Sequence, residues 1–183
     1  MKVITSILTV LITVALPVVV SSNTNPALAA TPIVVTNWDS RLDKVTTGKD
    51  GLILWVDIKR QRLSVFKKST KKFITSYQII TGKDGYQTPT GSFFINSNRE
   101  YDPDGNNIEL RGSYGSAYVQ IWNPFVGNSI AFHNAPWRQQ YEFGSTARRG
   151  KFGSHGCVNM DLDDAKDLWK RTSNGTRVIV TNN

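Results

Sequence analysis

Short runs of bulky hydrophobic residues, separated by polar turns, dominate the chain from residue 51 onward. In the segment LILWVDIKRQRLSVFKK, two such runs, at 52–57 and 62–66, flank the polar turn KRQ. The second run alternates apolar and polar positions, which is typical of a strand with one buried face. We therefore predict a pair of β-strands here and a third strand at 72–81.

Turn signals divide the rest of the chain into further strands. The loops GKDGYQTPTG and REYDPDGNN and the turn NPFVGN are rich in Gly, Pro, Asn and Asp, the residues that punctuate regular structure. The β-rich runs between them predict strands at 92–96, 118–122, 129–133 and 176–181.

One segment has helical periodicity, and we predict a helix over 162–172 that ends at TSNG. Asp161 is a suitable N-cap, and two further aspartates occupy the first turn. The apolar residues that share one face of this helix are Leu162, Ala165, Leu168 and Trp169. Many short strands and few helices indicate a mainly β fold, as a sandwich or a barrel.

The N-terminus has the order of a secretory signal: Lys2, an apolar run at 3–20, a polar turn, and the small-residue sequence Ala27-Leu28-Ala29. The apolar run is about long enough to cross a membrane. Thr and Ser residues interrupt it, however, and the A-x-A sequence follows at once, so we expect cleavage after Ala29 and no stable membrane anchor. The predicted organisation is a signal peptide at 1–29, an extended lead-in at 30–50 and one domain at 51–183, exported to the periplasm, cell wall or medium.

The chain is basic, with a formal net charge of +8, or +7 once the leader and its Lys2 are removed. A basic exported protein is attracted to anionic envelope polymers, although positive charge also aids solubility. The charges are scattered, and export removes nucleic acid as a partner, so we expect no nucleic-acid binding.

The stretch GSHGCVNMD, residues 153–161, holds the only cysteine, Cys157, and one of two histidines, His155; the other is His133. A single exported cysteine is buried and inert, paired between chains, or reactive. A reactive thiol needs an imidazole within hydrogen-bond reach, and backbone N–H groups in a tight turn can stabilise an oxyanion. Gly156 suits such a turn because it has no Cβ. From these residues alone, catalysis and simple packing both remain open.

Two motifs give the stretch a specific resemblance. SHGCVN at 154–159, together with FHNAPW around His133, resembles the signature of the L,D-transpeptidase catalytic domain (YkuD-like) family. TPTGSF at 88–93 and VDIKRQRLSVF resemble its other segments, and the similarity covers about 51–181. The resemblance implies a β-sandwich of mixed sheets with one or two short helices and an active site in a groove.

The resemblance also implies roles for the site residues. Cys157 would be the nucleophile and His133 the general base, with the backbone carbonyl of Asn134 orienting the imidazole. His155 would support the site, although the sequence leaves open an exchange of roles between the two histidines. Backbone N–H groups of Gly156 and Cys157 would form the oxyanion site.

Further residues of the motifs are expected to act through structure. Ser154 and Asn159 would hold the turn by hydrogen bonds. The 20 residues between His133 and Ser154 form a longer gap than the family usually has, so we expect a longer loop beside the site that influences substrate preference.

The substrate that the resemblance implies is a peptidoglycan tetrapeptide stem, with no metal or cofactor required. Cys157 would attack the L-centre carbonyl of diaminopimelate, D-Ala would leave, and the side-chain amine of a second stem would resolve the thioester into a 3→3 cross-link. Water as acceptor would give an L,D-carboxypeptidase. Aromatic and arginine side chains that could contact the stem are Tyr114, Tyr118, Trp122, Trp137, Arg138, Arg148 and Arg149.

The sequence leaves three different functions open besides this one. A sortase-like enzyme would use an arginine after the cysteine, for which Arg177 is available. A zinc hydrolase would use His133, His155 and Cys157 as ligands. A wall-binding module without catalysis is the third. The sequence does not identify the acyl acceptor or the oligomeric state.

Overall fold

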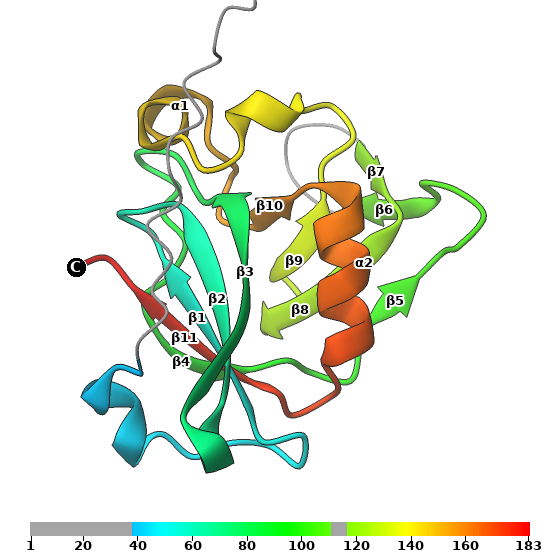
Figure 1. Cartoon of the computed structure of the whole chain (residues 1–183). Helices are drawn as coiled ribbons and strands as arrows, with labels where there is room; N and C mark the ends of the chain where they lie inside the picture. Colours follow the sequence, from blue (N-terminus) through cyan, green and yellow to red (C-terminus); the bar gives the residue numbers. More distant parts are fainter. Residues whose placement is uncertain (1–37, 111–116) are drawn as a thin grey trace, which may run out of the picture. The chain divides into compact units, whose positions relative to one another are not determined.

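The structure, a computed structural model, describes residues 38–110 and 117–183. The described residues form one compact unit (Figure 1). The predicted signal peptide and Tyr114 lie outside the described residues.

Strands dominate the described part of the chain. The main sheet has the strand order β4-β11-β1-β2-β3-β10-β9-β8-β5, and β6 and β7 form a separate two-stranded sheet. The strands are β1 (Leu52–Asp57), β2 (Arg62–Lys67), β3 (Lys72–Ile80), β4 (Gly91–Phe94), β5 (Glu100–Tyr101), β6 (Ile108–Leu110), β7 (Ala117–Val119), β8 (Ile121–Val126), β9 (Ile130–Asn134), β10 (Val158–Met160) and β11 (Arg177–Thr181).

The main sheet is mixed and curls back on itself. Strands β1, β2 and β3 pair antiparallel, whereas β11 runs parallel to β1, and β10 runs parallel to β9. Strand β3 joins the two halves because it pairs with β2 on one side and β10 on the other. The main hydrophobic core takes buried residues from both halves, such as Leu54 and Val65 from the first and Phe132 and Met160 from the second. The predicted mainly β fold with mixed sheets and few short helices is confirmed.

Helix α2 (Leu162–Arg171) agrees with the predicted helix to within one residue. The Asp161 carboxylate accepts a hydrogen bond from the Asp163 N–H at 3.0 Å and so caps the helix as expected. Ala165 and Leu168 are buried in the main core. The helix packs against β8 and β9, and β9 is the strand that carries His133 (Figure 1).

The segment between His133 and Ser154 is more ordered than the predicted loop. It contains the 3-10 turn η3 (Gln140–Glu142) and helix α1 (Thr146–Phe152). The sequence TARRGKF lacks an apolar face, so periodicity does not reveal the helix. Tertiary bonds from Arg149 to the Gly82 carbonyl, at 3.1 Å, and to Asp84, at 3.3 Å, tie α1 to the loop after β3.

The predicted turn NPFVGN was wrong in its first four residues, which continue strand β8. Pro124 has no N–H, and the β8–β9 register shifts between Pro124 and Val126, which accommodates the missing donor. Phe125 is buried in the core, so its packing outweighs the turn signal. The chain then reverses at Gly127, where φ is +50°.

Part of the predicted lead-in is folded onto the domain. The 3-10 turn η1 (Ser40–Lys44) is capped by Asp39 and buries Leu42 against Ile53, Trp55 and Phe66. Another 3-10 turn, η2 (Lys68–Thr70), links β2 to β3. None of the helices described in the structure is long and apolar enough to cross a membrane.

Candidate active site

Neighbouring parallel strands bring His133 and Cys157 together. Asn159 of β10 pairs with His133 of β9, and Val158 pairs with Phe132. Cys157, one residue before β10, therefore lies beside the start of β9. Its Sγ is 3.6 Å from the carbonyl oxygen of Ser129, and the Ala131 backbone also contacts the thiol.

The imidazole of His133 is held in one tautomer. Its Nδ1 lies 2.8 Å from the carbonyl oxygen of Asn134, the contact expected from the sequence. Because a carbonyl oxygen only accepts, Nδ1 carries the proton and Nε2 keeps the lone pair. Nε2 is therefore the atom able to receive a proton.

The side chain of Asn134 fixes that carbonyl in turn. Its Oδ1 accepts hydrogen bonds from the N–H groups of Gln120, at 2.8 Å, and Ile121, at 3.0 Å. Its Nδ2 donates to Asn106 Oδ1 at 3.0 Å. Asn134 is buried, so these bonds fix β9 against the start of β8 and the loop between β5 and β6, and they preorganise the imidazole.

Burial sets the charge state of the two groups. It lowers the pKa of His133 to about 4, and nearby Arg138 acts in the same direction, while the Asn134 carbonyl acts against it. Burial also raises the pKa of the Cys157 thiol to about 11, partly offset by the Ala131 backbone. At neutral pH the protein therefore holds a neutral thiol beside a neutral imidazole.

Two of the predicted aromatic contacts flank the imidazole. The Trp122 ring is nearly parallel to it, with centroids 5.9 Å apart and an interplanar angle of 24°. The Trp137 ring lies at the same distance with a 45° tilt, and 48 % of that residue is exposed. These indoles shield the base, and Trp137 presents an apolar surface to solvent next to it.

The SHGC turn is built around Gly156 and Ser154. Gly156 has φ of +119°, and a Cβ there would lie 2.6 Å from Ile130 Cδ1, so the position requires glycine. Ser154 Oγ accepts from the Gly156 N–H at 3.0 Å and donates to the Cys157 carbonyl, as expected for a residue that holds the turn.

Two expectations about this turn need correction. The Gly156 N–H already donates to Ser154 Oγ, so this amide is engaged inside the turn and is not a ready oxyanion donor. The Cys157 amide remains the predicted donor. Asn159 was expected to hold the turn, but its buried Oδ1 has no hydrogen-bond partner among the residues described.

Thr88 is a site residue whose role the sequence did not reveal. It is 2 % exposed within an otherwise exposed stretch of loop. Its Oγ1 accepts from the Gly82 N–H at 2.9 Å and donates to the Gly156 carbonyl at 2.7 Å. The TPTG motif therefore supports the SHGC turn from behind. The sequence contained the TPTG motif, but the motif does not show that Thr88 is buried.

His155 occupies a different environment from His133. It is exposed, and its ring packs edge-on against Tyr86 with centroids 4.8 Å apart. The Lys83 ammonium lies 5.0 Å from the Tyr86 ring. Partial burial and the Lys83 charge lower the pKa of His155. This geometry suits a supporting role rather than that of the base.

The remaining predicted substrate contacts belong to several elements and loops. Arg138 donates to the Phe152 carbonyl at 2.7 Å, and Arg149 is committed to Gly82 and Asp84. Arg148 lies in α1, and Tyr118 is 48 % exposed in β7 opposite Glu109 of β6.

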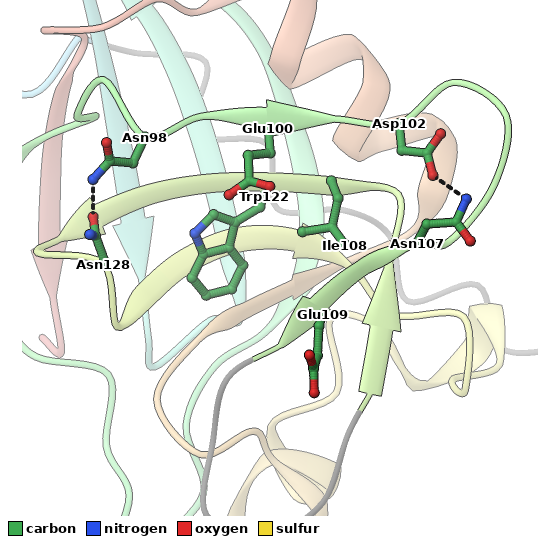
Figure 2. A pocket seen from close by; sticks show the side chains of 8 residues that line it. All are labelled: Asn98, Glu100, Asp102, Asn107, Ile108, Glu109, Trp122 and Asn128. Atoms are coloured by element: carbon green, nitrogen blue, oxygen red, sulfur yellow. Dashed lines mark hydrogen bonds between the residues drawn. The ribbon is translucent and has the colours of Figure 1, made fainter.

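A polar pocket of about 570 Å³, not predicted from the sequence, lies beside Trp122 (Figure 2). Trp122, which stacks on His133, is its aromatic wall. The described residues that line it are Asn98, Glu100, Asp102, Asn107, Ile108, Glu109, Trp122 and Asn128. Within the described ranges, no group of three or more His, Cys, Asp or Glu side chains could hold a metal ion, so a zinc hydrolase lacks a ligand set there.

Comparisons with known proteins identify the family. The family model for the L,D-transpeptidase catalytic domain (YkuD) matches residues 51–180. The chain is 31 % identical over 109 residues to YkuD of Bacillus subtilis (strain 168), covering 60 % of this chain and 54 % of that protein. It is 22 % identical over 135 residues to YciB of the same strain, covering 70 % and 66 %. Both relatives are assigned as L,D-transpeptidases.

A solved structure extends the likeness to the fold. A mutant form of the Enterococcus faecium L,D-transpeptidase superposes with a TM-score of 0.61 at 25 % identity, covering 72 % of this chain and 50 % of that one. The chain thus spans half to two thirds of the length of these relatives. Because the family model covers most of the chain, the resemblance of SHGCVN and FHNAPW is confirmed: the chain belongs to the L,D-transpeptidase catalytic domain family.

Proposed function

We propose that this chain is a cysteine-dependent L,D-transpeptidase that acts on peptidoglycan stem peptides and forms 3→3 cross-links with release of D-Ala. The observation that carries the proposal is the Asn134–His133 arrangement next to Cys157. The Asn134 carbonyl fixes the imidazole so that Nε2 keeps its lone pair, and the imidazole lies on the strand next to the chain's only thiol. Thiol-based acyl transfer requires this combination of base and nucleophile. Family membership supports the same activity.

The neutral resting state shapes the first step. Because the pKa values of His133, about 4, and of Cys157, about 11, disfavour a preformed ion pair, the thiol proton moves to Nε2 as sulfur attacks the donor carbonyl. The oxyanion forms next to the Cys157 amide at the end of the glycine turn. His133 then passes the proton to the amine of the departing D-Ala, leaving a thioester on Cys157.

The second step reuses the same groups. An amine of a second stem attacks the thioester carbonyl, its proton passes through His133 to the leaving sulfur, and the 3→3 amide bond forms. Water in place of the amine gives hydrolysis, so L,D-carboxypeptidase activity on the same stems is the alternative outcome. The choice depends on how well an amine competes with water at the thioester.

A sortase-like site and a wall-binding module find less support. Arg177, the candidate for a sortase-like site, lies in β11, and strands β1, β2 and β3 separate β11 from β10 in the sheet order. Its guanidinium donates to the Thr46 carbonyl at 2.6 Å and to Ser92 at 2.7 Å. A wall-binding module without catalysis has no need for the locked imidazole beside a thiol.

We also infer export. The leader at 1–29 supports it, and so does the positive charge, which favours anionic wall polymers. N-terminal sequencing of the protein recovered from outside the cytoplasm tests this inference. We expect the mature chain to begin at Ala30, and recovery of the intact leader in the exported fraction would contradict it.

Mass spectrometry of muropeptides tests the activity. The mature protein is incubated with disaccharide-tetrapeptides containing diaminopimelate, in parallel with Cys157→Ser. We expect 3→3 dimers, with tripeptides as the hydrolytic side product, from the wild-type protein and neither from the variant. Products that persist in Cys157→Ser would rule out the thiol mechanism. The absence of dimers, tripeptides and D-Ala release in the wild type would contradict the proposed L,D-transpeptidase activity.

A further inference from the structure

We propose that the end of the sheet beside the turns η1 and η2 is a docking surface for a linear phosphodiester polymer of the cell envelope. This inference goes beyond the proposed function, because it concerns retention of the protein on the envelope rather than acyl transfer, and it rests on the inferred export. We call the surface the lysine end, and its six lysines are Lys44, Lys49, Lys67, Lys68, Lys71 and Lys72.

The positive charge of the chain is concentrated in one part of it, whereas the sequence had suggested that the charges are scattered. Residues 38–72 hold ten lysines and arginines but only four acids. Residues 73–183 hold eleven lysines and arginines and ten acids, so they are nearly neutral. Residues 30–37, which precede the described range, carry no charged side chain and do not alter this balance. Nearly all the net charge of the mature chain therefore belongs to η1, β1, β2 and their turns.

Lysines of β2 and β3 lie opposite each other next to η2. Lys67 pairs directly with Lys72, and like charges at opposed positions destabilise a sheet. The Lys67 ammonium donates a hydrogen bond to the Asp50 carbonyl oxygen at 2.6 Å, and a neutral carbonyl does not cancel its charge. Lys49, next to Asp50 in the chain, is exposed. An anion bound at this end relieves the repulsion among these ammonium groups.

Contacts between η1 and η2 place the other lysines at the same end of the sheet. Lys68 donates a hydrogen bond to the carbonyl of Val45, which follows Lys44 in the chain. Lys71 forms an ion pair with Asp43 of η1 at 2.7 Å. The six lysines are thus gathered by tertiary contacts from two separate segments of the chain.

The lysine end lies away from the catalytic cysteine. Strand β3 begins at Lys72 and ends at Ile80. Ile80 pairs with Asn159, two residues after Cys157. The nine residues of β3 span about 25 Å of extended chain. In Figure 1, η1, drawn in blue, lies at the opposite end of β3 from β10. A polymer bound at the lysine end therefore leaves the site open to stem peptides.

The composition of the surface favours a polyanion in solution over a lipid membrane. Between residues 38 and 72, all of which the structure describes, no large hydrophobic side chain is exposed that could enter a bilayer. Ser69 and Thr70 are exposed between the lysines of η2 and offer hydroxyl groups to phosphate oxygens. Lysines are point charges on flexible stems, which suit the repeated phosphates of a flexible polymer. Within this surface, only Asp43 and Asp50 oppose the six lysines.

Binding of a defined polymer tests the inference. The probe is a synthetic oligomer of glycerol phosphate, and the comparison is vesicles of phosphatidylglycerol and phosphatidylcholine. The mature protein and the variant Lys44→Gln/Lys49→Gln/Lys72→Gln are titrated with each. These three lysines are exposed, so their substitution leaves the core intact.

A second triple variant, Lys59→Gln/Lys166→Gln/Lys170→Gln, is the matched control because it removes the same charge from the β1–β2 turn and from α2. We expect the Kd for the oligomer to rise about tenfold in the lysine-end variant and less than about twofold in the control. The slope of log Kd against log salt concentration should fall by about 2 in the lysine-end variant, as for the loss of three phosphate contacts to a single strand.

Acylation of Cys157 by a tetrapeptide stem is measured in the same three proteins and should be equal in all of them. Equal losses of oligomer affinity in the two variants would overturn the inference alone. Binding to the vesicles that is at least as tight, per phosphate, as binding to the oligomer would also overturn it in favour of a membrane. Absence of acylation in the wild type contradicts the proposed function and does not affect the binding result.

Discussion

Nδ1 of His133 lies 2.8 Å from the carbonyl oxygen of the residue that follows it, Asn134. A backbone carbonyl here does the orienting work that a carboxylate does in a serine triad, without adding a negative charge. Because no carboxylate among the described residues stabilises an imidazolium here, burial dominates and holds the pKa of His133 at about 4. The site therefore works from a neutral thiol and a neutral base.

Replacing each histidine separates their roles. We expect His133→Gln to lower the acylation rate by about 10²- to 10⁴-fold, because a glutamine side chain cannot accept the thiol proton as a base. His155→Gln, at an exposed position against Tyr86, should remain within about tenfold of wild type. Single-turnover acylation by a tetrapeptide donor measures both, and a larger loss in His155→Gln would mean that the histidines exchange roles.

The charge state of Cys157 predicts an unusual pH profile for alkylation. The thiolate is the reactive form, and a thiol whose pKa is about 11 stays protonated through the neutral range. Without donor substrate, the rate with iodoacetamide should therefore rise about tenfold per pH unit from pH 7 to 9.5. The urea-unfolded protein, with an ordinary thiol pKa of about 8.5, should level off near the upper end. A flat native profile would instead reveal a preformed thiolate–imidazolium pair.

Gly156 tests the geometry of the turn. At φ of +119°, with Ile130 Cδ1 2.6 Å from the added Cβ, Gly156→Ala should lower the free energy of unfolding by about 1–3 kcal/mol and abolish most acylation. The matched control is Gly127→Ala, at φ of +50° with open space around it, where we expect about 1 kcal/mol and normal activity. Urea unfolding measures the stability of both variants, and single-turnover kinetics measure their acylation rates. Full activity in Gly156→Ala would show that the turn has more freedom than its contacts indicate.

Thr88 tests the support behind that turn. Thr88→Val keeps the shape but removes the bonds to Gly82 and Gly156, so we expect a loss of about 1–3 kcal/mol in stability and slower acylation. Thr90→Val, at an exposed position in the same loop, is the control and should change neither. If the two variants behave alike in urea unfolding and acylation, the buried hydroxyl has no role in holding Gly156.

Local sequence patterns predicted the elements that depend on local signals. The strand pair after residue 51 and the capped helix after Asp161 have clear periodicity and a clear cap, and both formed as predicted. Pro124 and Phe125 did not follow their turn signal, because burial of Phe125 and a register shift override it. Helix α1 has no apolar face and depends on contacts of Arg149 with another loop, which no local pattern contains.

In the site, too, some features follow from local sequence and others from tertiary packing. The motifs around His133 and Cys157 were visible in the sequence, and so was the carbonyl contact that the family resemblance implied. The engagement of the Gly156 amide by Ser154 and the burial of Thr88 depend on loop packing. The pairing of Glu100 with Trp122, and of Trp122 with His133, depends on the register of three strands of the sheet. Pairing of this kind is decided by the whole sheet.

The central claim is that Cys157 carries a thioester to the donor stem. Intact-protein mass spectrometry after acid quenching of the mature protein with a tetrapeptide stem tests it most directly, with peptide mapping to locate the adduct. We predict an increase equal to the stem without its terminal D-Ala, on the peptide containing Cys157, sensitive to hydroxylamine and absent from Cys157→Ala. An adduct on another residue, or turnover of the stem by Cys157→Ala, would contradict the account.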